Sequence, residues 1–111
     1  MNKVSIINLQ DYRTPGSRVF TGRDRGIAVR DASNVDQIEE QSEQVIIQIP
    51  HDIGSINPSF LEEFLLNVVR KLQTEKFNAK FHFENEGRYK IASDLQEAIE
   101  RILREETALV H

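Results

Sequence analysis

The sequence predicts an α/β fold, in which a small mixed sheet of about four to five strands carries helices packed mainly on one face. Two observations support this prediction. Short segments rich in β-branched residues alternate along the chain with segments whose apolar residues recur every three or four positions. The chain also has 111 residues, which is the size of one domain, so residues 1–111 are expected to form a single unit.

Residues 3–43 are expected to form two strands and a helix with a narrow apolar face. Residues 3–9 are β-branched, and residues 17–22 are expected to pair with them in a hairpin, because Thr14-Pro15-Gly16 is a turn signal. Residues 22–43 have small and apolar residues at helical spacing, with a break expected near Asn34. The inward face of this helix is predicted to consist of Ala28, Ala32, Val35, Ile38 and Ser42.

The middle of the chain contains the clearest elements. Residues 43–50 read EQVIIQIP, an apolar run that predicts a central strand covered on both faces. Farther on, Asn57 is a natural N-cap and Pro58 suits the first position of a helix. The helix is expected over residues 58–74. Its wide apolar stripe consists of Phe60, Leu61, Phe64, Leu65, Val68, Val69 and Leu72.

The last part predicts a strand, a short extended piece and a helix. Residues 78–85 alternate between apolar and polar side chains, as in a half-exposed strand, and residues 86–92 contain a turn. A helix is expected over residues 93–106 with Ser93 as its N-cap, followed by a tail that reads TALVH. Its buried face is predicted to consist of Leu95, Ala98, Ile99, Ile102 and Leu103, and its outer pairs to be Glu97–Arg101 and Glu100–Arg104.

Composition narrows the classes of function. The formal net charge is −4 with both signs interspersed, which argues against nucleic-acid binding through a broad basic face. The chain has no cysteine, so disulfides and thiolate chemistry are excluded. No apolar run is long enough to cross a membrane, and the first residues lack the features of a signal peptide. A cytoplasmic protein that binds neither nucleic acid nor membrane is therefore expected.

Three stretches resemble a known family. The sequences FTGRDRGIAVR and VIIQI, followed by INPSFLEEFLLNVV, look like the STAS-like family of unknown function, which is related to the STAS domain of anti-sigma-factor antagonists. In that family a Gly-Arg segment leads the first helix, as Gly22-Arg23 does here. A Ser-Phe-Leu-(Asp/Glu)-Glu-(Phe/Leu) run starts the second helix, and residues 59–64 match it. The resemblance covers about residues 6–103.

The resemblance implies a regulatory site at the start of the second helix. In STAS antagonists an Asp-Ser-Ser-Gly segment lies there, and its second serine is phosphorylated by a partner ATPase of the histidine-kinase type. Here the segment is Asn57-Pro58-Ser59-Phe60, so Ser59 falls on the phosphoacceptor position. The partner-binding candidates are Arg23, Ile53, Ser55, Asn57 and Phe60. The alternative interpretation of Ser59 is a first-turn residue whose hydroxyl supplements the Asn57 cap.

Other chemistries have weaker support. Arg18, Arg23, Arg25 and Arg30 form either a solvated helix face or an anion contact. His51 and Asp52 share a loop with Ser59, but the sequence lacks the Gly-x-Ser-x-Gly elbow of a serine hydrolase. The three histidines lack metal-ligand spacing.

We therefore expect a non-enzymatic module without a cofactor or metal. Its partner would be a protein, either the ATPase or an anti-sigma-like regulator. The alternative is a structural or dimerisation module, pairing through an edge strand or the tail, so that either a monomer or a homodimer is consistent with the sequence.

Overall fold

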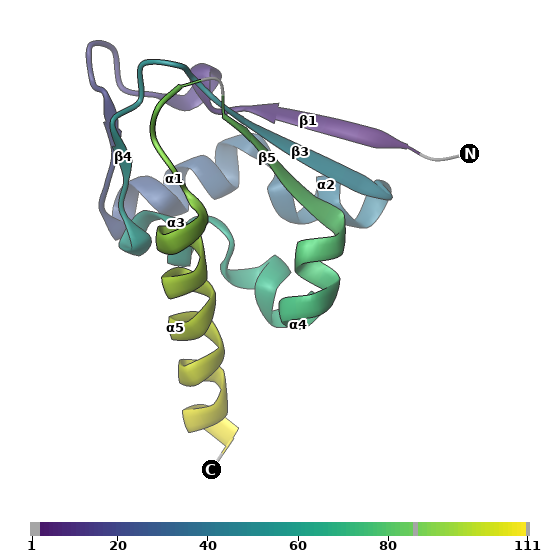
Figure 1. Cartoon of the computed structure of the whole chain (residues 1–111). Coiled ribbons are helices and arrows are strands. Elements are labelled where there is room, and N and C mark those ends of the chain that lie inside the picture. The colour runs from purple at the N-terminus through teal and green to yellow at the C-terminus, as the bar shows by residue number, and fades with distance from the viewer. Residues whose placement is uncertain (1–2, 86, 111) are drawn as a thin grey trace.

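A computed structural model describes residues 3–85 and 87–110 of the chain, and its centre is a three-stranded parallel sheet (Figure 1). The sheet consists of β1 (Val4–Asn8), β3 (Gln44–Ile49) and β5 (Phe81–Asn85) in the order β1-β3-β5. A separate parallel pair is formed by β2 (Val19–Phe20) and β4 (Ser55–Ile56). The α/β class is confirmed, whereas the single mixed sheet of four to five strands is not.

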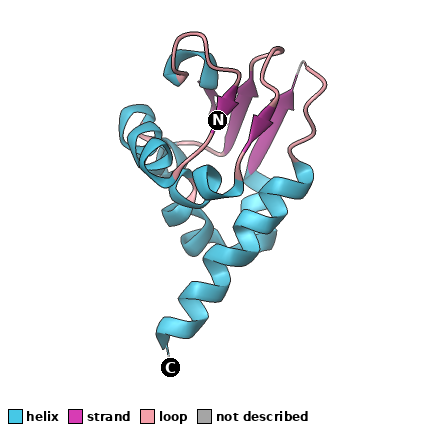
Figure 2. Ribbon diagram, turned by 90° about the vertical axis from the view of Figure 1, so that its left-hand side faces the viewer, coloured by secondary structure: helices cyan, strands magenta, loops and turns pink. Residues whose placement is uncertain are grey.

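The helices lie mainly on one face of the sheet, as predicted (Figure 2). On β3, Val45, Ile47 and Ile49 are buried beneath them, while the alternate side chains are only half-buried. The expected cover on both faces is therefore wrong, and exposed Val4 and Ile6 of β1 also mark an uncovered face. The helices are η1 (Leu9–Tyr12), α1 (Arg23–Ser33), α2 (Val35–Gln41), α3 (Pro58–Phe64), α4 (Leu66–Lys80) and α5 (Ala92–Val110).

The predicted hairpin between residues 3–9 and 17–22 does not form. The turn is present, since the Ser17 amide donates to the Thr14 carbonyl at 3.0 Å and Gly16 has a φ of 81°. However, the chain leaves β1 through η1, and β2 pairs with β4 instead. The pairing of β1 with β3 places Ile7 beside Ile47 on the buried face, a long-range packing that local turn signals do not reveal. The extended piece predicted at residues 86–92 is not a strand in its described part.

The break near Asn34 is confirmed, because Asn34 has left-handed backbone angles (φ 58°, ψ 37°) between α1 and α2. Of the predicted inward face, Val35 and Ser42 are buried and Ile38 is half-buried, but the part that lies on α1 is wrong. Ala28 and Ala32 are exposed, and the buried residues are Gly26, Val29 and Ser33. The reason is the crossing with α3, where a Cβ on Gly26 would lie 2.4 Å from the Phe60 carbonyl oxygen. The missing side chain lets the two helices approach closely.

The helix predicted over residues 58–74 is two helices. α3 ends at Phe64, and Leu65 (φ −104°, ψ 7°) separates it from α4. α4 continues to Lys80, so β5 begins only at Phe81, and a kink lies at Gln73 (φ 63°, ψ 177°). α5 begins at Ala92, which places Ser93 in its first turn rather than at the cap.

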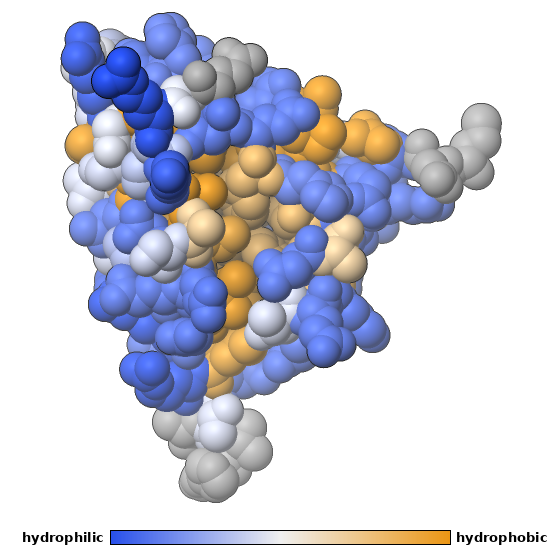
Figure 3. Space-filling view, in the orientation of Figure 1, coloured by the Kyte–Doolittle hydropathy of each residue, from blue (hydrophilic) through white to orange (hydrophobic). Residues whose placement is uncertain are grey.

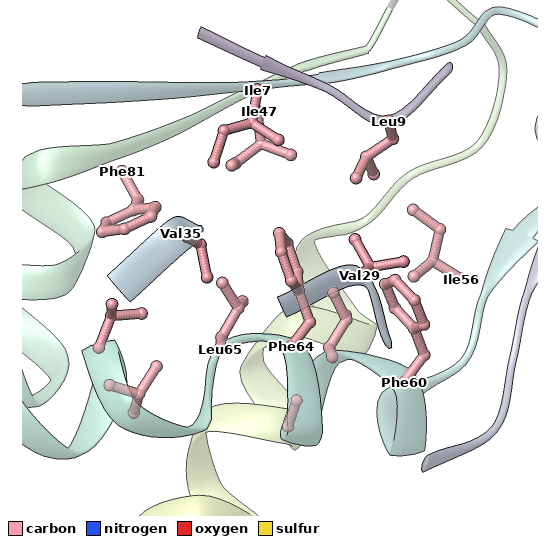
Figure 4. Packing of buried hydrophobic residues seen from close by; sticks show 14 of the residues in the cluster. Ile7, Leu9, Val29, Val35, Ile47, Ile56, Phe60, Phe64, Leu65 and Phe81 are labelled. Carbon is pink, nitrogen blue, oxygen red and sulfur yellow. The ribbon is translucent and has the colours of Figure 1, made fainter. Parts of the chain in front are cut away.

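The hydrophobic core lies between the central sheet and the helices (Figure 4). Ile7 and Ile47 point from the strands toward Phe64 and Leu65, and Phe60 packs against Val29 of α1. Aromatic rings continue this contact, because the ring centroids of Phe20 and Phe60 are 5.1 Å apart. Among the described residues, no helix has the length and apolarity to span a membrane.

Candidate functional site

The segment before α3, together with α3 itself, forms the region that we call the α3 junction, residues 53–64. Two backbone hydrogen bonds fix its position against the β2 region. The Gly54 amide donates to the Arg18 carbonyl at 2.7 Å, and the Asn57 amide donates to the Phe20 carbonyl at 2.8 Å. Because Ser55 and Ile56 pair with β2 between these bonds, the start of α3 has a defined place in the fold.

Ser59 lies in the first turn of α3 and is half-buried. The Asn57 side-chain oxygen accepts a hydrogen bond from the Ser59 amide at 2.9 Å, which confirms Asn57 as the N-cap. The Ser59 hydroxyl donates to the same oxygen at 2.8 Å. The hydroxyl therefore takes part in the cap, yet it remains at the edge of the surface.

Arg23 begins α1 and reaches across to α3. Its side chain is 53% exposed, and its guanidinium lies 2.9 Å from a carboxylate oxygen of Glu62 and 3.2 Å from one of Glu63. Glu62 is buried, and Arg101 of α5 approaches it from another side at 3.6 Å. A buried carboxylate is costly without cations beside it, so Arg23 and Arg101 compensate Glu62 where three helices meet.

The position of Arg23 brings it close to the predicted phosphoacceptor site. Glu62 and Glu63 are three and four residues after Ser59, so all three lie on one side of α3. Arg23 therefore contacts α3 one turn beyond Ser59.

Two of the partner-binding candidates are core residues. Ile53 is 3% exposed and Phe60 is fully buried, with its ring 5.1 Å from that of Phe20 and 5.7 Å from that of Phe64. Their side chains lie beneath the surface, so their assignment as contact residues is corrected. Phe60 was predicted both as part of the apolar stripe of its helix and as a partner contact. The structure agrees with the first prediction, because the side chain is buried. Ser55 and Asn57 remain exposed.

The remaining polar residues near the junction have partners of their own. Arg13 donates to both oxygens of Asp52, at 2.8 and 3.1 Å, and this contact lowers the pKa of the Asp52 carboxyl. Arg25 donates to the Tyr12 carbonyl, and Arg30 donates to the Glu63 carbonyl at 2.7 Å. Asp52 therefore forms an ion pair with Arg13. Two of the four arginines of the basic cluster, Arg25 and Arg30, donate hydrogen bonds to backbone carbonyl groups. No set of histidine, aspartate and glutamate within the described residues is arranged to hold a metal ion.

Sequence reasoning missed two buried carboxylates. Glu62 follows Leu61 beside the apolar stripe, and this position in the sequence could have indicated that its carboxylate is buried. Glu39 of α2 lies 2.7 Å from Lys71 and 2.6 Å from Lys80. Burial alone would raise the pKa of Glu39, but the two lysines outweigh it and hold the pKa below its ordinary value. These contacts join α2 to the middle of α4, at Lys71, and to its C-terminal end, at Lys80.

Comparison with known proteins gives no further guide: no family model, no curated protein and no solved structure matches the chain.

Proposed function

We propose that the chain is a STAS-like regulatory module that docks on a protein partner through the exposed part of the α3 junction. The docking surface would consist of Ser55, Asn57 and Ser59, with Arg23 at its edge. The observation that supports this proposal is the half-exposed Ser59 in the first turn of α3, held by Asn57 next to an exposed neighbouring strand end. The partner would be an ATPase of the histidine-kinase type acting as a serine kinase, or an anti-sigma-like regulator, in the cytoplasm.

A phosphate on Ser59 would act as a switch through charge. It would add up to about two negative charges at pH 7. Those charges would lie one helical turn from Glu62 and Glu63, to which Arg23 is already paired. The phosphate would repel these carboxylates and compete with them for Arg23, and it would also break the hydroxyl contact with Asn57. Both effects change the surface that the partner would touch.

A binding role suits this serine better than a nucleophilic one. The Ser59 hydroxyl donates its hydrogen bond to the side-chain amide oxygen of Asn57, and this oxygen cannot take up a proton as a general base. The nearest carboxylate in the loop sequence, Asp52, is bound by Arg13. These contacts support a non-enzymatic module.

Mass spectrometry of the chain recovered from its own cells would test the phosphoacceptor. We expect phosphate on Ser59, lost in Ser59→Ala and retained in Ser55→Ala, the matched control on the same surface. Phosphate on a different residue would contradict the assignment. We also expect Ser59→Asp to weaken co-purification with the partner, and an unchanged yield would contradict the switch.

A structural or dimerisation module remains the second candidate. One observation favours it: α5 has an apolar face that the fold covers only in part, and the chain could pair through this face without any phosphate. Equal partner binding by Ser59→Asp and the unaltered chain would favour this candidate over the switch.

A further inference from the structure

An open groove runs between α4 and α5, with a volume of about 710 Å³. Leu95, Ile99 and Leu103 of α5 line one wall, and Thr74 and Asn78 of α4 line the other. Figure 3 shows this groove as an apolar band between the two helices, on a face that is otherwise mostly polar. In this groove Leu95 and Leu103 are half-buried and Ile99 is buried, so the described part of the chain covers its apolar surface only in part.

α5 also extends beyond the other helices. Its C-terminal half projects away from the body of the molecule in both ribbon views (Figures 1 and 2). The groove-lining residues Leu103 and Thr107 lie on this half. Ile102 on this half is buried, whereas Leu103 is half-buried and Thr107 is exposed. A partly exposed apolar residue on a protruding helix suits a surface that pairs with another helix.

The charges beside the stripe indicate which helix would pair with it. Gln96, Glu100 and Arg104 each follow an apolar residue of the stripe by one position, so they form a polar row along one flank. Glu100 and Arg104 are exposed and form no salt bridge within the described residues, so the predicted pair between them is not seen, whereas the predicted Glu97–Arg101 pair is present at 3.3 Å. The row therefore runs from neutral Gln96 through acidic Glu100 to basic Arg104.

This row complements a second copy of itself only when the two helices are antiparallel. In a twofold-symmetric antiparallel pair, the same flank of each helix faces the other with the order reversed. Glu100 then meets Arg104 of the second copy, and Arg104 meets its Glu100. In a parallel pair this flank would face the opposite flank of the second copy, so the Glu100–Arg104 contacts would not form.

We propose that this face of α5 is a self-association surface, through which two copies of the chain form an antiparallel α5–α5 dimer. Leu103 of each copy packs across the twofold axis, and the two Glu100–Arg104 contacts flank this pair. The inference does not depend on Ser59, since the α3 junction takes no part in it.

Sedimentation equilibrium of the full chain, from about 1 μM to about 1 mM, would test the proposal. We expect a concentration-dependent dimer. Glu100→Arg and Arg104→Glu alone each turn two attractions into two repulsions, and each should raise the dissociation constant by at least about tenfold. Glu105→Arg makes the same charge reversal on the opposite side of α5 and should leave the dimer unchanged.

The decisive samples restore the pairing. The double variant Glu100→Arg/Arg104→Glu should dimerise again, and so should an equal mixture of the two single variants, because each then offers the charges that the other lacks. A chain that stays monomeric throughout would overturn the proposal and leave the groove to a different partner. A dimer that ignores both single variants would also overturn it, because the copies would then join through another surface, such as the edge of β1. Circular dichroism checks that every variant is folded.

Discussion

α3 and α5 differ in how much of each helix the fold uses. α3 has seven residues, and four of them, Phe60, Leu61, Glu62 and Phe64, are buried. α5 has nineteen residues, and the described ones that are buried are Ala98, Ile99 and Ile102. A helix as short as α3 is not stable by itself, so its surroundings must hold it, whereas α5 is long enough to present a face to solvent. Tertiary contacts thus fix the position of Ser59 and leave the outer face of α5 exposed to solvent.

Truncating a central side chain of each helix should give the largest difference. Phe60→Ala removes a fully buried ring between Phe20 and Phe64, and we expect the free energy of unfolding to fall by about 3–5 kcal/mol. Leu95→Ala, on the half-buried face of α5, should cost only about 1 kcal/mol. Urea denaturation of both variants would measure the two losses. Equal losses would mean that α5 is held as tightly as α3.

The close approach of α1 to α3 provides a second test. Gly26→Ala places a methyl group 2.4 Å from the Phe60 carbonyl oxygen and 2.8 Å from Cβ of Glu63, so one helix must shift. We expect a loss of about 1–3 kcal/mol by thermal or urea unfolding. Gly54→Ala is the matched control, since its methyl group would lie 3.7 Å from the Arg18 carbonyl oxygen, which is an ordinary van der Waals distance. A Gly26→Ala chain as stable as the control would refute the close packing.

Tyr89 connects the two regions and makes their contact sensitive to pH. Its hydroxyl lies 2.6 Å from an Asp94 oxygen in the first turn of α5 and 3.0 Å from the Ile56 carbonyl just before α3. Burial, together with the bond to Asp94, raises the pKa of Tyr89 above its ordinary value of 10.0. The folded state therefore favours the protonated phenol. Its contribution is complete below about pH 10 and is lost as the pH rises toward the folded-state pKa.

Replacing this hydroxyl should show both effects. Tyr89→Phe should lower the free energy of unfolding by about 1–2 kcal/mol at neutral pH. Between neutral pH and about pH 11 it should also lose less stability than the unaltered chain, because the group that ionises on unfolding is gone. Tyr12→Phe retains Tyr89 and should keep the full alkaline loss. Urea titrations at the two pH values would measure these changes, and identical pH dependence in all three chains would contradict the assignment.

The smallest expected effect is a difference in stability between two variants at Gln73, the kink beside α5. Gln73 has a φ of 63°, which favours glycine, and its side chain donates to the Arg70 carbonyl at 2.7 Å and lies 3.4 Å from Glu106 of α5. Gln73→Gly relieves the backbone strain, whereas Gln73→Ala removes the same side-chain contacts but keeps the strain. We expect the glycine variant to be more stable than the alanine variant by about 1 kcal/mol in thermal unfolding. The reverse order would mean that the kink is not strained.

Local features of the fold were predictable from the sequence, and contacts between distant segments were not. Asn57 and Pro58 correctly marked the start of α3, and Asn34 marked the break between α1 and α2, because capping and left-handed turns depend on neighbouring residues. The pairing of β2 with β4 and the burial of Gly26 depend on segments far away in the chain. Helical periodicity placed Phe60 in an apolar stripe, and that signal, rather than the resemblance, agreed with its position in the core.

The parallel order β1-β3-β5 has a consequence for how the chain folds. Val4 pairs with Gln44 and Val45 with Phe81, so every ladder of this sheet joins residues from distant parts of the sequence. Closing such long loops costs entropy before the pairing compensates for it, which slows folding relative to proteins with mostly local contacts. We expect the helices to form early and the sheet to close late. Until it closes, apolar Val45 and Ile47 remain accessible, so newly made chains pass through a stage in which aggregation competes with folding.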